Sequence, residues 1–146
     1  MREQLFKAIY DSGLVIAHDE ELKGGLLLSY GEKSYIRVSS DTCIESIHYL
    51  HSLSHEFAHY QFYRKHPRFS RVFHDARFNW NQGYSRYFLF IWIDELIAWW
   101  FGYQICKKYN VNTKSYWHHA WKHFSTYLTG APRKQVIKNR KPNDLQ

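Results

Sequence analysis

The sequence contains few of the residues that mark a disulfide-stabilised or secreted protein. Its 146 residues include only two cysteines, Cys43 and Cys106, and neither belongs to a CxxC pair. Two cysteines do not make a disulfide framework, so we expect free thiols in a reducing compartment. The first residues are charged and amphipathic, and they lack the apolar core of a signal peptide. We therefore expect a cytoplasmic protein.

No run of hydrophobic residues is long enough to suggest a membrane span. The most apolar stretch, residues 87–103, is shorter than the about 20 apolar residues that a span needs, and Asp94 and Glu95 interrupt its centre. Charged residues in such a stretch indicate a buried site rather than a bilayer. We expect no membrane partner.

Aromatic residues and positive charge are abundant. Aromatic side chains make up 19% of the chain, enough to fill the core of one small domain, and the formal net charge is +7. A basic balance favours acidic partners such as nucleic acid, although most of the charges are scattered. Because residues 131–146 are rich in lysine and arginine, we expect a single domain over residues 1–130 followed by a basic tail.

The hydrophobic pattern predicts a helix and a β-hairpin in the first part of the chain. Residues 2–12 have helical spacing, and residues 24–30 and 33–40 flank a short turn that contains a glycine. In the second strand, the polar face carries Tyr35, Arg37 and Ser39. This strand could hold an extended peptide by edge pairing, so we expect it to form the substrate-binding edge.

Helices are expected to dominate the rest of the chain. Residues 68–83 have no clear period and are expected to form a loop with a short helix. Residues 84–108 are apolar enough for a central buried helix, and a last helix is expected over residues 112–130. The fold class predicted is α+β, with a small twisted sheet of about three strands packed against a helical bundle.

The helix after the hairpin carries the main chemical motif. It is predicted to begin at Thr42, which a glutamate follows three residues later as in a capping box, and to end before Pro67. Within it, His55, Glu56 and His59 form an HExxH sequence. Histidines four apart lie on one face of a helix and can bind one zinc ion, while the glutamate flanks the metal without ligating it. Zinc activates a water molecule at such a site, and Glu56 would be the catalytic base.

Two alternatives concern the metal ligands. His51 and His55 have the same spacing as His55 and His59, but only the second pair encloses a glutamate. A catalytic zinc needs a third protein ligand, and Glu95 is the first candidate because a carboxylate in an apolar helix needs a metal or a cation. The alternative ligand is His74, and the structural alternative for Glu95 is a salt bridge to an arginine such as Arg86 or to another base.

Other residues are candidates for supporting roles. Asp94 could hydrogen-bond a ligand histidine from outside the metal shell. Zinc-dependent hydrolysis also needs a group besides the metal that stabilises the oxyanion, and a tyrosine or histidine can do this. The sequence alone leaves this role open among Tyr60, Tyr84, Tyr103 and His119.

With HExxH followed by Glu95-x-x-Ala98-Trp99, the chain resembles the gluzincin metallopeptidases, and most of all the minimal-scaffold members and the ImmA/IrrE-like peptidases. The resemblance covers roughly residues 26–103. It implies a zincin-like fold, ligation of one zinc ion by His55, His59 and Glu95, and a base at Glu56. The chain departs from the pattern in a longer interval before Glu95 and in Trp99, where some gluzincins carry an aspartate that orients a ligand.

The function expected is therefore hydrolysis of peptide bonds in a protein or peptide substrate by a zinc-dependent metallopeptidase. His74 followed by Asp75 is similar to a feature of SprT-like DNA-associated proteases, whose third ligand is a histidine, and this alternative agrees with the positive charge. A second alternative is a non-catalytic, zinc-stabilised module that binds nucleic acid or protein. A structural zinc would have four protein ligands and no open position.

Overall fold

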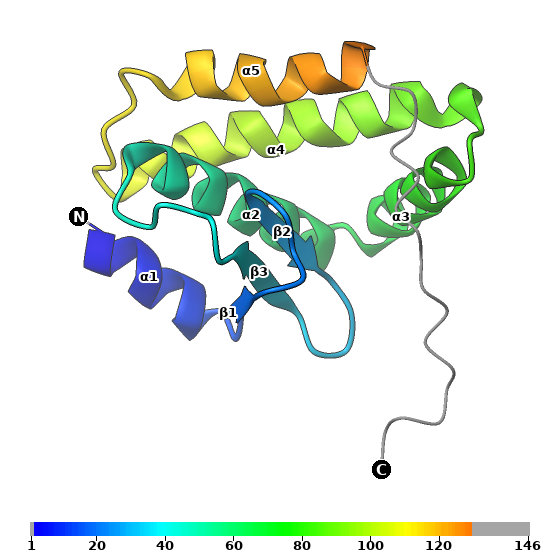
Figure 1. Ribbon diagram of the computed structural model, residues 1–146. Helices are drawn as coiled ribbons and strands as arrows, with labels where there is room; N and C mark the ends of the chain where they lie inside the picture. Colours follow the sequence, from blue (N-terminus) through cyan, green and yellow to red (C-terminus); the bar gives the residue numbers. More distant parts are fainter. Residues whose placement is uncertain (1, 130–146) are drawn as a thin grey trace.

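The computed structural model describes residues 2–129 and shows an α+β fold in which a small sheet packs against helices (Figure 1). The basic tail expected over residues 131–146 lies outside the described residues. In chain order the elements are α1 (Arg2–Asp11), β1 (Val15–Asp19), β2 (Leu26–Ser29), β3 (Tyr35–Ser39), α2 (Ile47–Lys65), α3 (Pro67–Asn81), the 3-10 turn η1 (Ser85–Tyr87), α4 (Phe88–Lys108) and α5 (Tyr116–Thr129).

The three strands form one mixed sheet in the order β1-β3-β2. The hairpin prediction is confirmed, because β2 runs antiparallel to β3. The prediction that Tyr35, Arg37 and Ser39 form a substrate-binding edge is wrong. Strand β3 is central and pairs with β1 on its other side, and Arg37 forms an ion pair with Asp19 at 2.5 Å. The free edge next to the helices belongs to β2.

Two helix boundaries differ from the sequence prediction. Helix α2 begins at Ile47, because the hydroxyl of Ser46 rather than that of Thr42 accepts the Tyr49 N–H at 3.1 Å. Its end at Lys65 agrees with the prediction. The stretch expected to be mostly loop is the regular helix α3, which begins at Pro67, where a proline costs no hydrogen bond, and buries one narrow face.

Helix α4 makes most of its contacts with α2, and it also packs against α3 and α5. Its inward face carries Asp94, Glu95 and Ala98, all at most 4% exposed. Its outward face is apolar and open, with Leu96 52% and Trp100 53% exposed. Helix α5 runs beside α4 (Figure 1). No helix among the described residues combines the length and apolar character needed to cross a membrane.

The close approach of α2 and α4 depends on a glycine. A Cβ atom built on Gly102 would lie 2.5 Å from the Tyr116 hydroxyl and 3.1 Å from the backbone of His55. The Tyr116 hydroxyl donates to the Trp99 carbonyl at 2.8 Å, and Tyr116 is fully buried. The backbone that presents His55 is therefore held directly against α4.

We expect Gly102→Ala to destabilise the protein by about 1–3 kcal/mol, because the cost of overpacking exceeds the gain in helix propensity of about 1 kcal/mol. Urea unfolding followed by circular dichroism measures this change. Gly31→Ala is the matched control, since a Cβ there meets nothing within 4 Å. Equal stability of the Gly102 variant and the wild type would contradict the packing argument.

Candidate metal centre

The HExxH residues lie on α2 with both histidines facing α4. His55 and His59 are 5% and 4% exposed, and their ring centroids are 4.6 Å apart at an interplanar angle of 79°. One helical turn thus brings both imidazoles to the same place, as the spacing predicts. His55 also stacks on the indole of Trp99, with a centroid distance of 4.0 Å.

The carboxylate of Glu95 reaches both imidazoles from α4. Its Oε2 is 3.3 Å from His55 Nε2, and its Oε1 is 3.8 Å from His59 Nε2. One ligand atom from each of the three residues lies within 4.8 Å of the other two, so the group could hold a metal ion. All three side chains are buried, and His55 Nδ1 has no hydrogen-bond partner. Two imidazoles and a carboxylate are a donor set that suits zinc.

Asp94 supports the group from behind His59. Its Oδ1 is 3.2 Å from His59 Nδ1, and its Oδ2 accepts a hydrogen bond from the Tyr63 hydroxyl at 2.7 Å. A carboxylate on the outer nitrogen of a ligand histidine fixes the ring and increases its basicity. Asp94 lies next to a ligand histidine as an ion-pair partner, whereas its Oδ1 has no hydrogen-bond partner among the described residues, so the predicted hydrogen bond stays a prediction. Trp99 stacks on the other imidazole.

Arg77 of α3 neutralises part of the negative charge. Its guanidinium donates to Glu95 Oε1 at 2.5 Å and to Asp94 Oδ2 at 2.8 Å. The cation paired with Glu95 is thus Arg77 and not Arg86. Arg77 was not predicted as a site residue, because it lies in the stretch expected to be a loop with a short helix, where no direction can be given to a side chain.

These charges shift the protonation of the group strongly. Burial alone would lower the pKa of His59, but the carboxylates of Asp94 and Glu95 outweigh burial and raise it to about 10. Burial raises the pKa of Asp94, but His59, Arg77 and Tyr63 lower it to about 2. The pKa of Glu95 also lies well below its usual value, because Arg77 and the two histidines outweigh burial. Without a metal, the carboxylates of Asp94 and Glu95 are therefore ionised, and the cations that face them are Arg77 and protonated His59.

Glu56 points to the sheet. Its Oε2 accepts the backbone N–H of Leu28 in β2 at 2.9 Å. This bond fixes the carboxylate at the free edge of the sheet, one residue along α2 from His55. The position is compatible with proton transfer beside the group and does not make Glu56 a ligand.

Tyr127 of α5 is a site residue that the sequence analysis did not single out. Its hydroxyl donates to Glu95 Oε1 at 3.3 Å. Burial and then the Glu95 carboxylate raise its pKa, and Glu56 adds to the effect, so the hydroxyl keeps its proton. Nothing local distinguishes Tyr127 from the other 11 tyrosines of the chain's 12, since its role arises from the packing of α5 against α4.

Most other candidates have different partners. The Tyr60 hydroxyl donates to the Ser12 carbonyl at 2.9 Å, and Tyr103 packs on Trp117 with centroids 5.2 Å apart. Tyr84 is exposed. His119 Nε2 lies 2.9 Å from the Ser52 hydroxyl.

The rival ligands are also engaged elsewhere. His51 Nε2 donates to the Asn112 carbonyl at 2.7 Å, which favours the pair His55 and His59 over His51 and His55. His74 packs edge-on against Tyr63 and Tyr30 and is not part of the group that could hold an ion.

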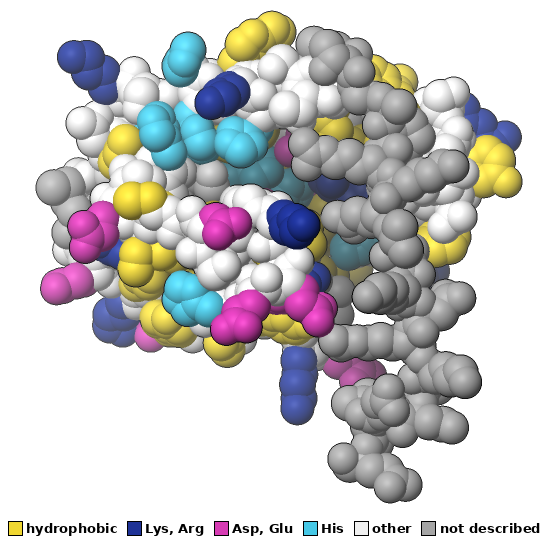
Figure 2. Space-filling view, in the orientation of Figure 1, with side chains coloured by type: hydrophobic (Ala, Val, Ile, Leu, Met, Phe, Trp, Pro, Cys, Tyr) yellow, Lys and Arg dark blue, Asp and Glu magenta, His cyan; other side chains and the backbone are white. Residues whose placement is uncertain are grey.

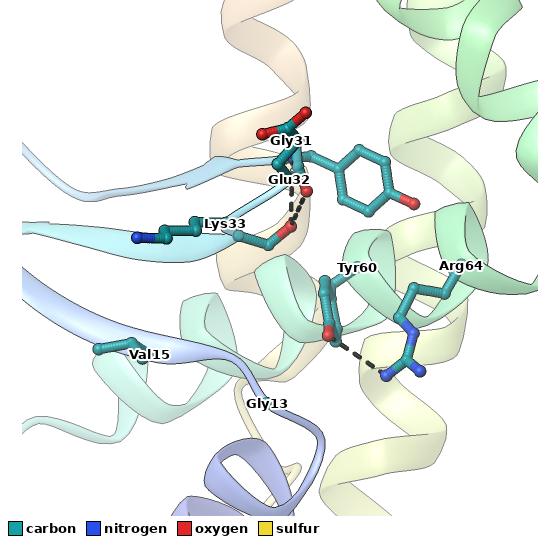
Figure 3. Close-up of a pocket in the computed structure, with 9 residues that line it drawn as sticks. Gly13, Val15, Gly31, Glu32, Lys33, Tyr60 and Arg64 are labelled. Carbon is teal, nitrogen blue, oxygen red and sulfur yellow. Dashed lines mark hydrogen bonds between the residues drawn. The ribbon is translucent and has the colours of Figure 1, made fainter.

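A cavity of about 420 Å³ lies at the turn between β2 and β3, away from the histidines (Figure 3). Its cationic member, Arg64, donates to the Ser12 carbonyl at 3.0 Å and to the Tyr60 hydroxyl at 3.3 Å. Lys33 extends away from Arg64 (Figure 3). None of His55, His59 and Glu95 lines this cavity, so it is separate from the candidate metal centre.

No family model matches the sequence, and no curated protein or solved structure matches it either. The resemblance to gluzincins therefore stays an expectation from the sequence motif.

We expect Asp94→Asn to weaken zinc binding about 10–100-fold, because the amide no longer increases the basicity of His59. The amide oxygen can still accept from Tyr63 and Arg77. Competition with a chromogenic chelator measures the affinity, and Asp75→Asn, an exposed acid on α3, is the control. Unchanged affinity in the Asp94 variant would exclude the supporting role of this carboxylate.

Zinc binding at pH 7 should release about one proton per ion. His59 is protonated in the metal-free protein at this pH, because its pKa is raised to about 10, whereas a ligand imidazole must be neutral. Calorimetric titration in two buffers with different ionisation enthalpies counts the protons. Identical enthalpies in both buffers would show that His59 is already neutral.

Proposed function

We propose that this chain is a zinc-dependent metallopeptidase that hydrolyses peptide bonds of a protein or peptide substrate. The observation that carries the proposal is the convergence of His55, His59 and Glu95, whose ligand atoms lie within 4.8 Å of one another. The base expected from the motif, Glu56, lies in the same helical turn.

The number of ligands favours a catalytic site over a structural one. Among the described residues, the group contains three metal-binding side chains, whereas structural zinc sites have four protein ligands. A zinc ion bound by three protein ligands supplies Lewis acidity to a water molecule and to a carbonyl oxygen at its open position. This count argues against the zinc-stabilised binding module.

Glu56 supplies the base in this proposal. Its Oε2 is held by the Leu28 N–H, so Oε1 is the atom that would take a proton from the attacking water. The carboxylate would then pass this proton to the amine that leaves when the peptide bond breaks.

Tyr127 is suited to stabilise the developing negative charge on the carbonyl oxygen. Its hydroxyl lies 3.3 Å from Glu95 Oε1 and keeps its proton, since burial raises its pKa. An O–H donor next to the ligand carboxylate could turn toward an oxyanion at the adjacent position.

Strand β2 would hold the substrate in an extended conformation. The Leu28 N–H faces the free edge, because it donates to Glu56 and not to β3. Backbone groups of residues two apart point the same way in a strand, so those of Leu26 face this edge as well. A peptide added to β2 would therefore pass directly beside Glu56.

We expect Glu56→Gln to lower peptidase activity at least about 100-fold while zinc content stays unchanged, because the amide cannot take a proton. Cleavage of a fluorogenic peptide library and metal analysis of the same preparation measure both quantities. Glu45→Gln, an exposed acid before α2, is the matched control. Equal activity of the Glu56 variant and the wild type would refute the proposed base.

A further inference from the structure

A second cluster of histidines lies outside the group described above. His48 of α2 stacks on His119 of α5 with ring centroids 4.7 Å apart, and His119 lies 4.5 Å from His123. Figure 2 shows histidine side chains gathered on one face of the molecule, with further histidine surface recessed beside them. Neither the HExxH motif nor the proposed reaction uses these three residues.

The pair on α5 repeats the geometry of the pair on α2. His119 and His123 are four residues apart, with centroids 4.5 Å apart at 66°, compared with 4.6 Å at 79° for His55 and His59. One turn of helix therefore presents two imidazoles to one point in both places. The second pair lacks a glutamate between its histidines and so lacks a base.

His48 supplies a third imidazole from the facing helix. All three histidines line a pocket of about 240 Å³ whose other lining residues include Ser52 and Asp41. In the described chain, their ligand atoms do not all lie within 4.8 Å of one another, as those of the first group do. His48 stacks on His119 at an interplanar angle of 21°, and two nearly parallel rings do not direct their nitrogens at one ion, so binding requires that His48 turn. His48 and His123 are exposed, which leaves their side chains free to take other rotamers.

The imidazole of His119, the central ring of the three, is hydrogen-bonded and neutral. The Ser52 hydroxyl lies 2.9 Å from His119 Nε2 and fixes the ring, which leaves Nδ1 as the other ligand atom. Burial and the neighbouring histidines lower the pKa of His119 to about 3, and burial lowers the pKa of His123 as well. Neutral imidazoles are the form that binds metal.

The indole of Trp99 lies next to both histidine pairs. It stacks on His55 at 4.0 Å, and its centroid is 5.8 Å from His119 and 5.9 Å from His123. The indole therefore contacts histidines of both clusters, and no residue belongs to both sets of ligands.

We propose that His48, His119 and His123 form a second site for a divalent transition cation such as Zn²⁺, with water completing the coordination. Imidazole ligands suit Zn²⁺, Ni²⁺ and Cu²⁺, whereas Mg²⁺ and Ca²⁺ prefer oxygen. The site is open to solvent, and it does not depend on the proposed peptidase activity.

The number of ions per chain tests the proposal. The untagged full chain is dialysed against Zn²⁺ and its metal content is measured; we expect two ions per chain. His119→Ala combined with His123→Ala should leave one ion, and His59→Ala should remove the other. His118→Ala, an exposed histidine on the same helix outside the pocket, should keep both.

A single bound ion that only the His59 variant loses would overturn the second site, as would two ions that persist in the double variant. If the double variant does not fold, His123→Gln alone decides the matter, because this side chain is exposed. In this variant, the ion at the second site should bind at least about 10-fold more weakly than in the wild type. Unchanged affinity for both ions would overturn the proposal. Neither outcome depends on whether any peptide is cleaved.

Discussion

The structure depends on how two adjacent buried carboxylates are neutralised. Asp94 and Glu95 are 1% and 4% exposed in the middle of an apolar helix, where an unpaired charge would cost several kcal/mol. The compensating groups come from three other helices. His55 and His59 lie on α2 and Arg77 lies on α3, while the phenol of Tyr127 lies on α5. The same contacts that assemble the candidate metal centre therefore also hold four helices together.

The sequence predicted the parts of the site that depend on local periodicity. The HExxH spacing alone places His55 and His59 on one helix face, and the cost of burying a carboxylate indicates that Glu95 needs a partner. Both predictions refer to residues within one helix or to the surroundings of one charge. In the structure, the ligand atoms of His55, His59 and Glu95 lie within 4.8 Å of one another.

The remaining parts could not be predicted because they depend on contacts between elements. Arg77 was missed because residues 68–83 were taken as aperiodic, although Phe69, Val72, Phe73 and Ala76 follow the spacing of a helix, and because its carboxylate partners lie on another helix. Strand β3 was taken as an edge because the alternation of its side chains says nothing of its neighbours, and only the pairing with β1 makes it central. Tyr127 becomes significant only once α5 lies on α4. The order of strands and the packing of helices are long-range properties that a local pattern does not contain.

Helix α4 has an unusual distribution of polarity. Its carboxylates face the interior, while Leu96, Trp100 and other large apolar side chains face solvent. Its buried side also carries Ile91, Trp99 and Ile105, so apolar side chains occupy both faces of α4 and hydropathy alone does not distinguish the inward face. Along α4, the two acidic positions are therefore as constrained as the buried apolar ones, whereas exposed apolar positions such as Leu96 and Trp100 are the least constrained by the interior. A ranking of positions by hydrophobicity alone would therefore miss Asp94 and Glu95, on which the candidate metal centre depends.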